Sequence, residues 1–79
     1  MYQFYVVEIR KNAQGEFEHD VFWVYDTDEK TARQKGESKY YEVMSRAAIS
    51  TYAEHSAILF SSQGYALMSK YYTHDATTD

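Results

Sequence analysis

Tyr2-Gln-Phe-Tyr-Val-Val-Glu-Ile9 is a near-continuous hydrophobic run close to the amino terminus. Two shorter runs of the same kind follow it, Val21-Phe-Trp-Val-Tyr25 and Ala57-Ile-Leu-Phe60. Runs of this density are typical of strands that are buried on both sides, because a strand with one wet face alternates apolar and polar residues. We therefore expect a β-sheet with two apolar faces.

Turn motifs and one helical pattern set the order of the elements. Asn12-Ala-Gln-Gly15 and Ser61-Ser-Gln-Gly64 each suit a type I turn with a glycine bulge. Between these hairpins we predict a helix that Asp26 caps, with Glu29 completing a capping box, and that ends near Ala47 or Ala48. Its apolar stripe consists of Ala32, Gly36, Tyr40, Val43, Met44 and Ala47. We expect Gly36 to mark a close contact between helix and sheet.

These elements predict one α+β domain of the order ββαββ over residues 1–74. Its strands are expected at residues 2–11, 16–25, 52–61 and 65–74, in a four-stranded, mainly antiparallel sheet with one helix packed on one face. The strand order stays open, and the helical connection also allows a parallel central pair. The polar end, residues 75–79, is expected to be disordered.

The bulged turns predict which residues face each other across each hairpin. In the first, the pairs are Ile9–His19, Val7–Val21 and Tyr5–Trp23 on one face, and Phe4–Val24, Val6–Phe22 and Arg10–Glu18 on the other. In the second, they are Leu59–Leu67, His55–Tyr71, Ile58–Met68 and Phe60–Ala66. A slip by one residue in the first hairpin would set apolar residues against acidic ones.

One helix is too narrow to cover such a sheet. Four strands span roughly 15–19 Å, whereas a helix is about 10 Å across. We therefore predict a homodimer or a protein-interaction module. The expected interface is Phe4, Val6, Phe22, Val24, Ile58, Phe60 and Met68, with the exposed helix residue Tyr41. The sequence does not show which face the helix covers, so the set can be exchanged for Tyr5, Val7, Val21, Trp23, Leu59 and Leu67.

Composition narrows the functional classes. The chain has 79 residues, no Cys and a net charge of −4, which excludes disulfides and thiolate metal sites and disfavours general binding to a phosphate backbone. No stretch resembles a signal peptide or a membrane span. We expect a cytoplasmic protein without cofactors.

Residues for catalysis or metal binding form no recognisable pattern. The histidines His19, His55 and His74 have no helical spacing, and we expect no carboxylates paired beside them. His55 and Ser56 are adjacent on a strand and so point to opposite faces. We therefore predict neither a metal site nor an enzyme.

An alternative function is a weak nucleic-acid-binding or regulatory module. Its candidate residues are Lys35, Lys39 and Arg46 on one side of the helix. Because the aromatic residues lie on the sheet, away from these charges, and Glu42 can pair with Arg46, the sequence favours an ordinary solvated helix face.

Several segments resemble a group of small uncharacterised bacterial proteins. These are Phe4-Tyr-Val-Val-Glu-Ile-Arg-Lys-Asn12, Glu37-Ser-Lys-Tyr40, His55-Ser-Ala-Ile-Leu59 and Leu67-Met-Ser-Lys-Tyr-Tyr-Thr-His74. Such proteins are often encoded in mobile or phage-derived elements of Gram-positive bacteria. The resemblance implies a compact fold and that genetic context, and no activity.

Overall fold

The computed structural model describes residues 1–74, and the predicted disordered end, residues 75–79, lies outside them. The elements are β1 (Tyr2–Lys11), β2 (Phe17–Asp26), α1 (Glu29–Ala48), β3 (Glu54–Ser61) and β4 (Ala66–Thr73). The predicted ββαββ order is confirmed, with strand ends that differ by no more than two residues.

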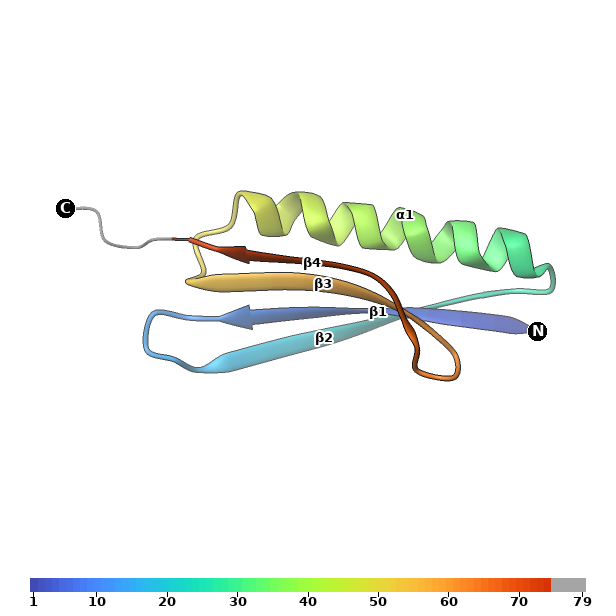
Figure 1. Cartoon of the computed structure of the whole chain (residues 1–79), viewed down its shortest axis with the longest axis horizontal. Coiled ribbons are helices and arrows are strands. Elements are labelled where there is room, and N and C mark those ends of the chain that lie inside the picture. Colours follow the sequence, from blue (N-terminus) through green and yellow to red (C-terminus); the bar gives the residue numbers. More distant parts are fainter. Residues whose placement is uncertain (75–79) are drawn as a thin grey trace.

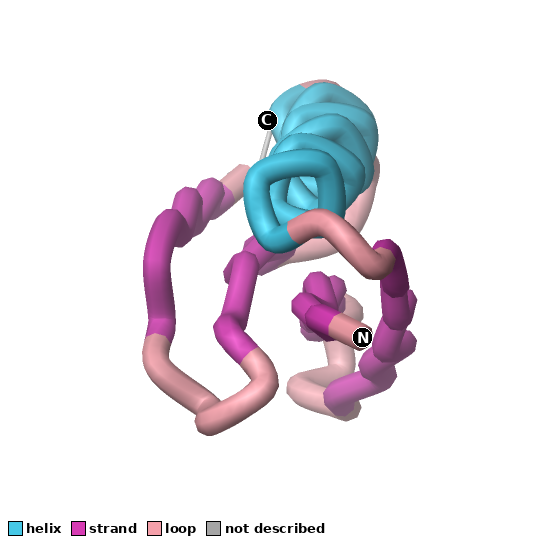
Figure 2. The backbone as a smooth tube through the Cα atoms, turned by 90° about the vertical axis from the view of Figure 1, so that its right-hand side faces the viewer, coloured by secondary structure: helices cyan, strands magenta, loops and turns pink. Residues whose placement is uncertain are grey.

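The four strands form one antiparallel sheet in the order β2-β1-β3-β4 (Figure 1). β1 lies beside β3, so the parallel central pair that the sequence left open does not form. Figure 2, a view along the strands, shows α1 on one side of the sheet only. The other side is covered by no element of the described chain, and we call it the open face.

The two hairpin turns have the predicted geometry. Gly15 and Gly64 have φ of 85° and 88°, values that favour glycine because it has no Cβ. Backbone bonds from Gly15 to Asn12 (3.0 Å) and from Gly64 to Ser61 (2.8 Å) close the turns. The first hairpin therefore has the predicted register throughout, from Tyr5 opposite Trp23 to Arg10 opposite Glu18.

The second hairpin departs from its predicted register. Phe60 lies opposite Ala66 as expected, but an irregularity between Leu59 and Phe60 shifts the rest by one residue. Leu59 consequently lies opposite Met68, Ile58 opposite Ser69 and His55 opposite Tyr72, and not opposite Leu67, Met68 and Tyr71. The shift lets both Leu67 and Met68 pack against the core.

The core lies between α1 and the sheet. It consists of Phe4, Val6, Ala32, Tyr40, Val43, Ala57 and Leu59. Gly36 lets the helix approach closely, since a Cβ there would lie 2.9 Å from Leu59 Cδ1 and 3.2 Å from Phe4 Cβ. The predicted helix–sheet contact at Gly36 is thus confirmed.

The helix cap is Asp28, and the prediction of Asp26 is wrong. The Asp28 carboxylate accepts hydrogen bonds from the Thr31 backbone N–H (2.9 Å) and hydroxyl (2.8 Å). Asp26 instead accepts a bond from the Asp28 N–H (2.9 Å), one turn before the helix. Asp26 has Glu29 three positions later, and Asp28 has Thr31 three positions later, so the sequence alone allowed either aspartate to be the helix cap.

Replacing Asp28 by Ala is expected to lower the free energy of unfolding by about 1 kcal/mol, because two first-turn donors lose their acceptor. Urea denaturation at neutral pH measures this. Asp28→Ser is the matched control, since serine also caps helices and should restore most of the loss. An equal loss in both variants would contradict the capping role.

Candidate functional site

The open face is an apolar surface that no element of residues 1–74 covers. The strand registers place ten large apolar or aromatic residues on it: Tyr5, Val7, Ile9, Phe17, Val21, Trp23, Tyr25, Ile58, Phe60 and Tyr71. Trp23 is 46 % exposed and Tyr71 is 60 % exposed. Contiguous exposed apolar patches, unlike single exposed residues, often mark interaction surfaces.

Four aromatic rings on the open face form a ladder across three strands. The centroid of Tyr5 lies 4.6 Å from that of Trp23 and 5.0 Å from that of Phe60. Tyr25 continues the series 6.4 Å from Trp23. These are contact distances for aromatic pairs, so the rings hold one another in place and present a fixed surface.

The open face is almost free of net charge. Its charged groups, within the described residues, are Lys11 and Glu54, whose side chains pair with each other at 3.4 Å. A nucleic-acid surface needs an excess of positive charge. A surface that pairs with a second copy of itself needs no net charge, because like charges on the two copies would face and repel each other.

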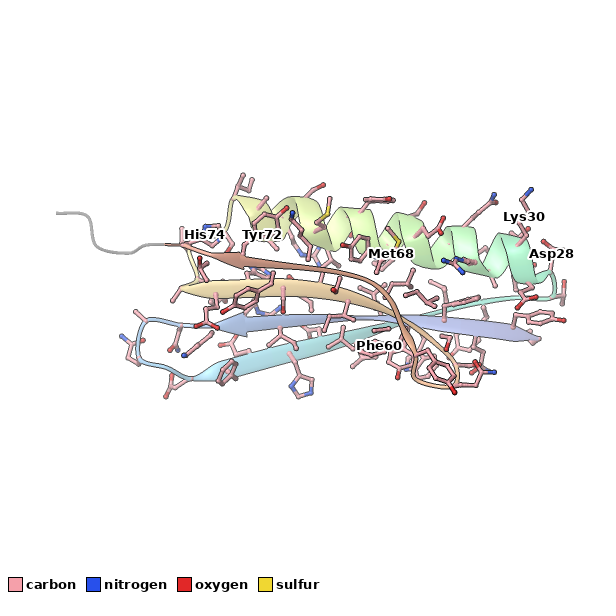
Figure 3. The ribbon with its side chains drawn as sticks, in the orientation of Figure 1. Asp28, Lys30, Phe60, Met68, Tyr72 and His74 are labelled. Carbon is pink, nitrogen blue, oxygen red and sulfur yellow. The ribbon has the colours of Figure 1, made fainter. Side chains whose placement is uncertain are left out.

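The predicted interface residues are divided between the two faces. Phe4 and Val6 are buried beneath α1 at 7 % and 0 % exposure, and Phe22 and Val24 pack against the same core. Met68 also lies on the helix side, whereas Phe60 lies on the open face, as Figure 3 shows. The single patch predicted from these residues is therefore wrong in composition.

The error has a definite origin. The β1–β3 register sets Val7 opposite Ile58 and Tyr5 opposite Phe60. Ile58 and Phe60 consequently share a face with Tyr5 and Val7, and lie on the opposite face from Phe4 and Val6. Tyr41, on the helix, is 50 % exposed and contacts Tyr40 edge-on at 5.3 Å, far from the open face in the fold.

A second feature, a buried polar cluster, was not predicted. The Glu8 carboxylate is 2 % exposed and accepts bonds from Arg46 Nη2 (2.7 Å) and Nε (3.0 Å). His55 Nε2 lies 2.7 Å from Glu8 Oε2. The sequence led us to expect no pair of carboxylates beside any histidine. A single carboxylate was not considered, and Glu8 and His55 lie on different hairpins, so no local pattern connects them.

The electrostatics of the cluster are dominated by Glu8. Burial works against its ionisation, but hydrogen bonds from Arg46 and His55 and the charges of Arg46 and Arg10 outweigh it and lower the pKa of Glu8 to about 2. The carboxylate is thus an acceptor at neutral pH, and His55 Nε2 donates to it. Buried His55 Nδ1 has no hydrogen-bond partner among residues 1–74.

The three basic residues of the alternative function all have acidic partners. Lys35 Nζ lies 2.9 Å from Asp26, Lys39 Nζ 3.1 Å from Glu42, and Arg46 is bound to Glu8. Paired charges attract phosphates less than free ones do. A nucleic-acid role for Lys35, Lys39 and Arg46 stays a prediction that these contacts do not favour.

Comparisons with known proteins add no relative. Neither the protein-family models, nor the curated proteins, nor the solved structures contain a match to this chain. Within residues 1–74 no group of three potential ligand side chains is arranged for a metal ion, and no helix there is long and apolar enough to cross a membrane.

Proposed function

We propose that this chain is a non-enzymatic interaction module that forms a homodimer through the open face of its sheet. The observation that carries the proposal is the exposed aromatic ladder on a face that no described element covers. Its self-complementarity is supported by the near absence of charge, since a second copy would bring no repulsive charges to the interface.

The available area fits a dimer of modest size. At about 200 Å² for a whole aromatic side chain, the exposed parts of Phe17, Trp23, Tyr25 and Tyr71 amount to roughly 400 Å². The half-buried residues between them add further area. Two such faces together approach the roughly 1,000 Å² that a specific interface needs.

A dilution series tests the dimer. We expect native mass by light scattering to be that of a dimer at high micromolar concentration and to fall towards that of a monomer on dilution. Trp23→Asp, which puts a charge in the middle of the ladder, should weaken association by about 100-fold or more, equivalent to about 3 kcal/mol.

The matched control is Tyr41→Asp, which introduces the same charge at an equally exposed aromatic residue on the helix. It should leave association unchanged. Dimers that dissociate in Tyr41→Asp and persist in Trp23→Asp would place the interface on the helix. A wild-type chain that is monomeric at every concentration would refute the homodimer.

The cytoplasmic location and the mobile-element context belong to the same proposal. The mobile-element context depends on the resemblance to small bacterial proteins, and the cytoplasmic location is supported by the absence of Cys from the sequence.

A further inference from the structure

One histidine belongs to the open face. His19 lies on β2, directly opposite Ile9 of β1, and its side chain is exposed on that face. The two other histidines lie on the helix side, where His55 contacts Glu8 and His74 bonds to a carbonyl of α1. A group that titrates near neutral pH is thus present on the surface that we assign to the second copy.

The nearest neighbours of His19 on this face are apolar. Phe17 and Val21 precede and follow it along β2 on the same side of the strand, and they are 65 % and 44 % exposed. Ile9 lies across the hairpin. A side chain with interface residues on three sides is covered when a second copy covers them. His19 therefore enters the interface with Phe17 and Val21.

The charged neighbour of His19 on the open face is Lys11. Lys11 and Val7 lie diagonally across the hairpin from His19, within reach of a long side chain. Lys11 Nζ lies 3.4 Å from Glu54 and 5.4 Å from the centre of the Phe17 ring. The lysine and its carboxylate thus pair with each other, and the lysine offers a protonated His19 only repulsion.

The acidic residues next to His19 in the sequence lie on the other face. Glu18 and Asp20 are on the helix side of β2, where both contact Arg10, at 3.4 and 2.7 Å. β2 is an edge strand, so no further strand lies beyond it in the described chain. The ion pairs within residues 1–74 include none to His19.

Protonation would therefore place an unpaired charge in the covered interface. A histidine changes its charge between about pH 5 and 8, and removing an unpaired charge from water is costly. The neutral form of His19 is favoured in the dimer and the charged form in the free chain. Because dissociation then takes up protons, a lower pH favours the monomer.

We propose that His19 is a pH switch of the homodimer, which lets the two copies associate when it is neutral and separates them when it is protonated. This inference rests on the proposed dimer through the open face. The overall charge acts in the opposite direction, since the chain carries −4 at neutral pH and protonation reduces the repulsion between two copies. A dimer that weakens in acid therefore indicates a specific group in the interface.

Light scattering of the full chain, over dilution series at about pH 7.5 and about pH 5.5, tests the proposal. We expect the dissociation constant of the dimer to be about tenfold or more higher at the lower pH, because each interface contains two copies of His19. His19→Gln, which stays neutral, should dimerise equally at both pH values. The matched control His74→Gln should keep the response of the wild type.

A permanent charge separates this histidine from other effects of acid. His19→Lys should raise the dissociation constant by about tenfold or more already at neutral pH. Ser45→Lys, which adds the same charge at an exposed position of α1, should leave it unchanged. Circular dichroism at each pH checks that all chains stay folded, so that dissociation is measured on the native protein.

Three results would overturn the proposal. The first is a dissociation constant that is equal at the two pH values, and the second is one that falls in acid. The third is the same response to acid in the wild type and in His19→Gln. In each of these cases the dimer at neutral pH leaves the proposed function intact. A wild-type chain that is monomeric at neutral pH would instead refute the homodimer, and the pH switch with it.

Discussion

Replacing Glu8 by Ala is expected to lower the free energy of unfolding by about 3 kcal/mol at neutral pH, because it leaves the donor of buried His55 without its acceptor and removes the bidentate partner of Arg46, which keeps only its ion pair with Glu42. For a chain of this size that is a large part of the total stability. Urea denaturation followed by the fluorescence of Trp23 measures it.

The same carboxylate predicts how stability depends on pH. The folded pKa of Glu8, about 2, lies below its ordinary value of 4.5. Stabilisation by Glu8 is therefore present above about pH 4.5 and is lost as the pH falls through about 2, an effect of about 3 kcal/mol. The stability difference between the wild type and the Ala variant should shrink by about this amount over that range.

Glu8→Gln is the matched control, since it keeps the shape of the side chain and removes its ionisation. Its free energy of unfolding at neutral pH should lie between those of the wild type and Glu8→Ala. As in Glu8→Ala, it should fall less than that of the wild type as the pH is lowered. A stability difference that stays constant from pH 6 to 2 would contradict the assignment of the low pKa to Glu8.

Gly36→Val is the second change with a large expected effect. A Cβ at Gly36 would lie 2.9 Å from Leu59 Cδ1 and 3.2 Å from Phe4 Cβ. Leu59 is fully buried and cannot turn away freely, and the Phe4 Cβ is fixed to the backbone. The branched side chain would therefore push α1 off the sheet, and we expect a loss of about 3 kcal/mol in the free energy of unfolding.

Two comparisons isolate the steric cause. Ser45→Val makes a β-branched change at an exposed helix position and should cost less than about 0.7 kcal/mol. Gly36→Ala gains about 1 kcal/mol of helix propensity, which offsets part of its smaller clash. Equal losses at Gly36→Val and Ser45→Val would show that the helix does not depend on this close contact.

The sequence by itself determined the elements and the first hairpin. Turn glycines, the helical stripe and the acidic start of the helix are local signals, which depend on residues within a few positions of each other. The register of β1 against β2 was equally accessible, since a tight turn with a glycine bulge fixes which residues face each other.

Only the tertiary structure decided the order of the strands and the composition of the open face. The pairing of β1 with β3 joins residues about 50 positions apart and depends on how the whole sheet packs against α1. No local pattern showed that Ile58 and Phe60 share a face with Tyr5 and Val7. The irregularity beside Phe60, which shifted the second hairpin by one residue, was invisible for the same reason.

The buried cluster shows the same division between local and long-range information. Glu8, Arg46 and His55 come from β1, α1 and β3, and each looks like an ordinary residue in its own segment. These residues meet because α1 packs over the central strands β1 and β3. Local chemistry thus fixed which elements form and which turns join them. The faces they share were fixed by long-range packing, because burial depends on the whole arrangement and not on any one segment.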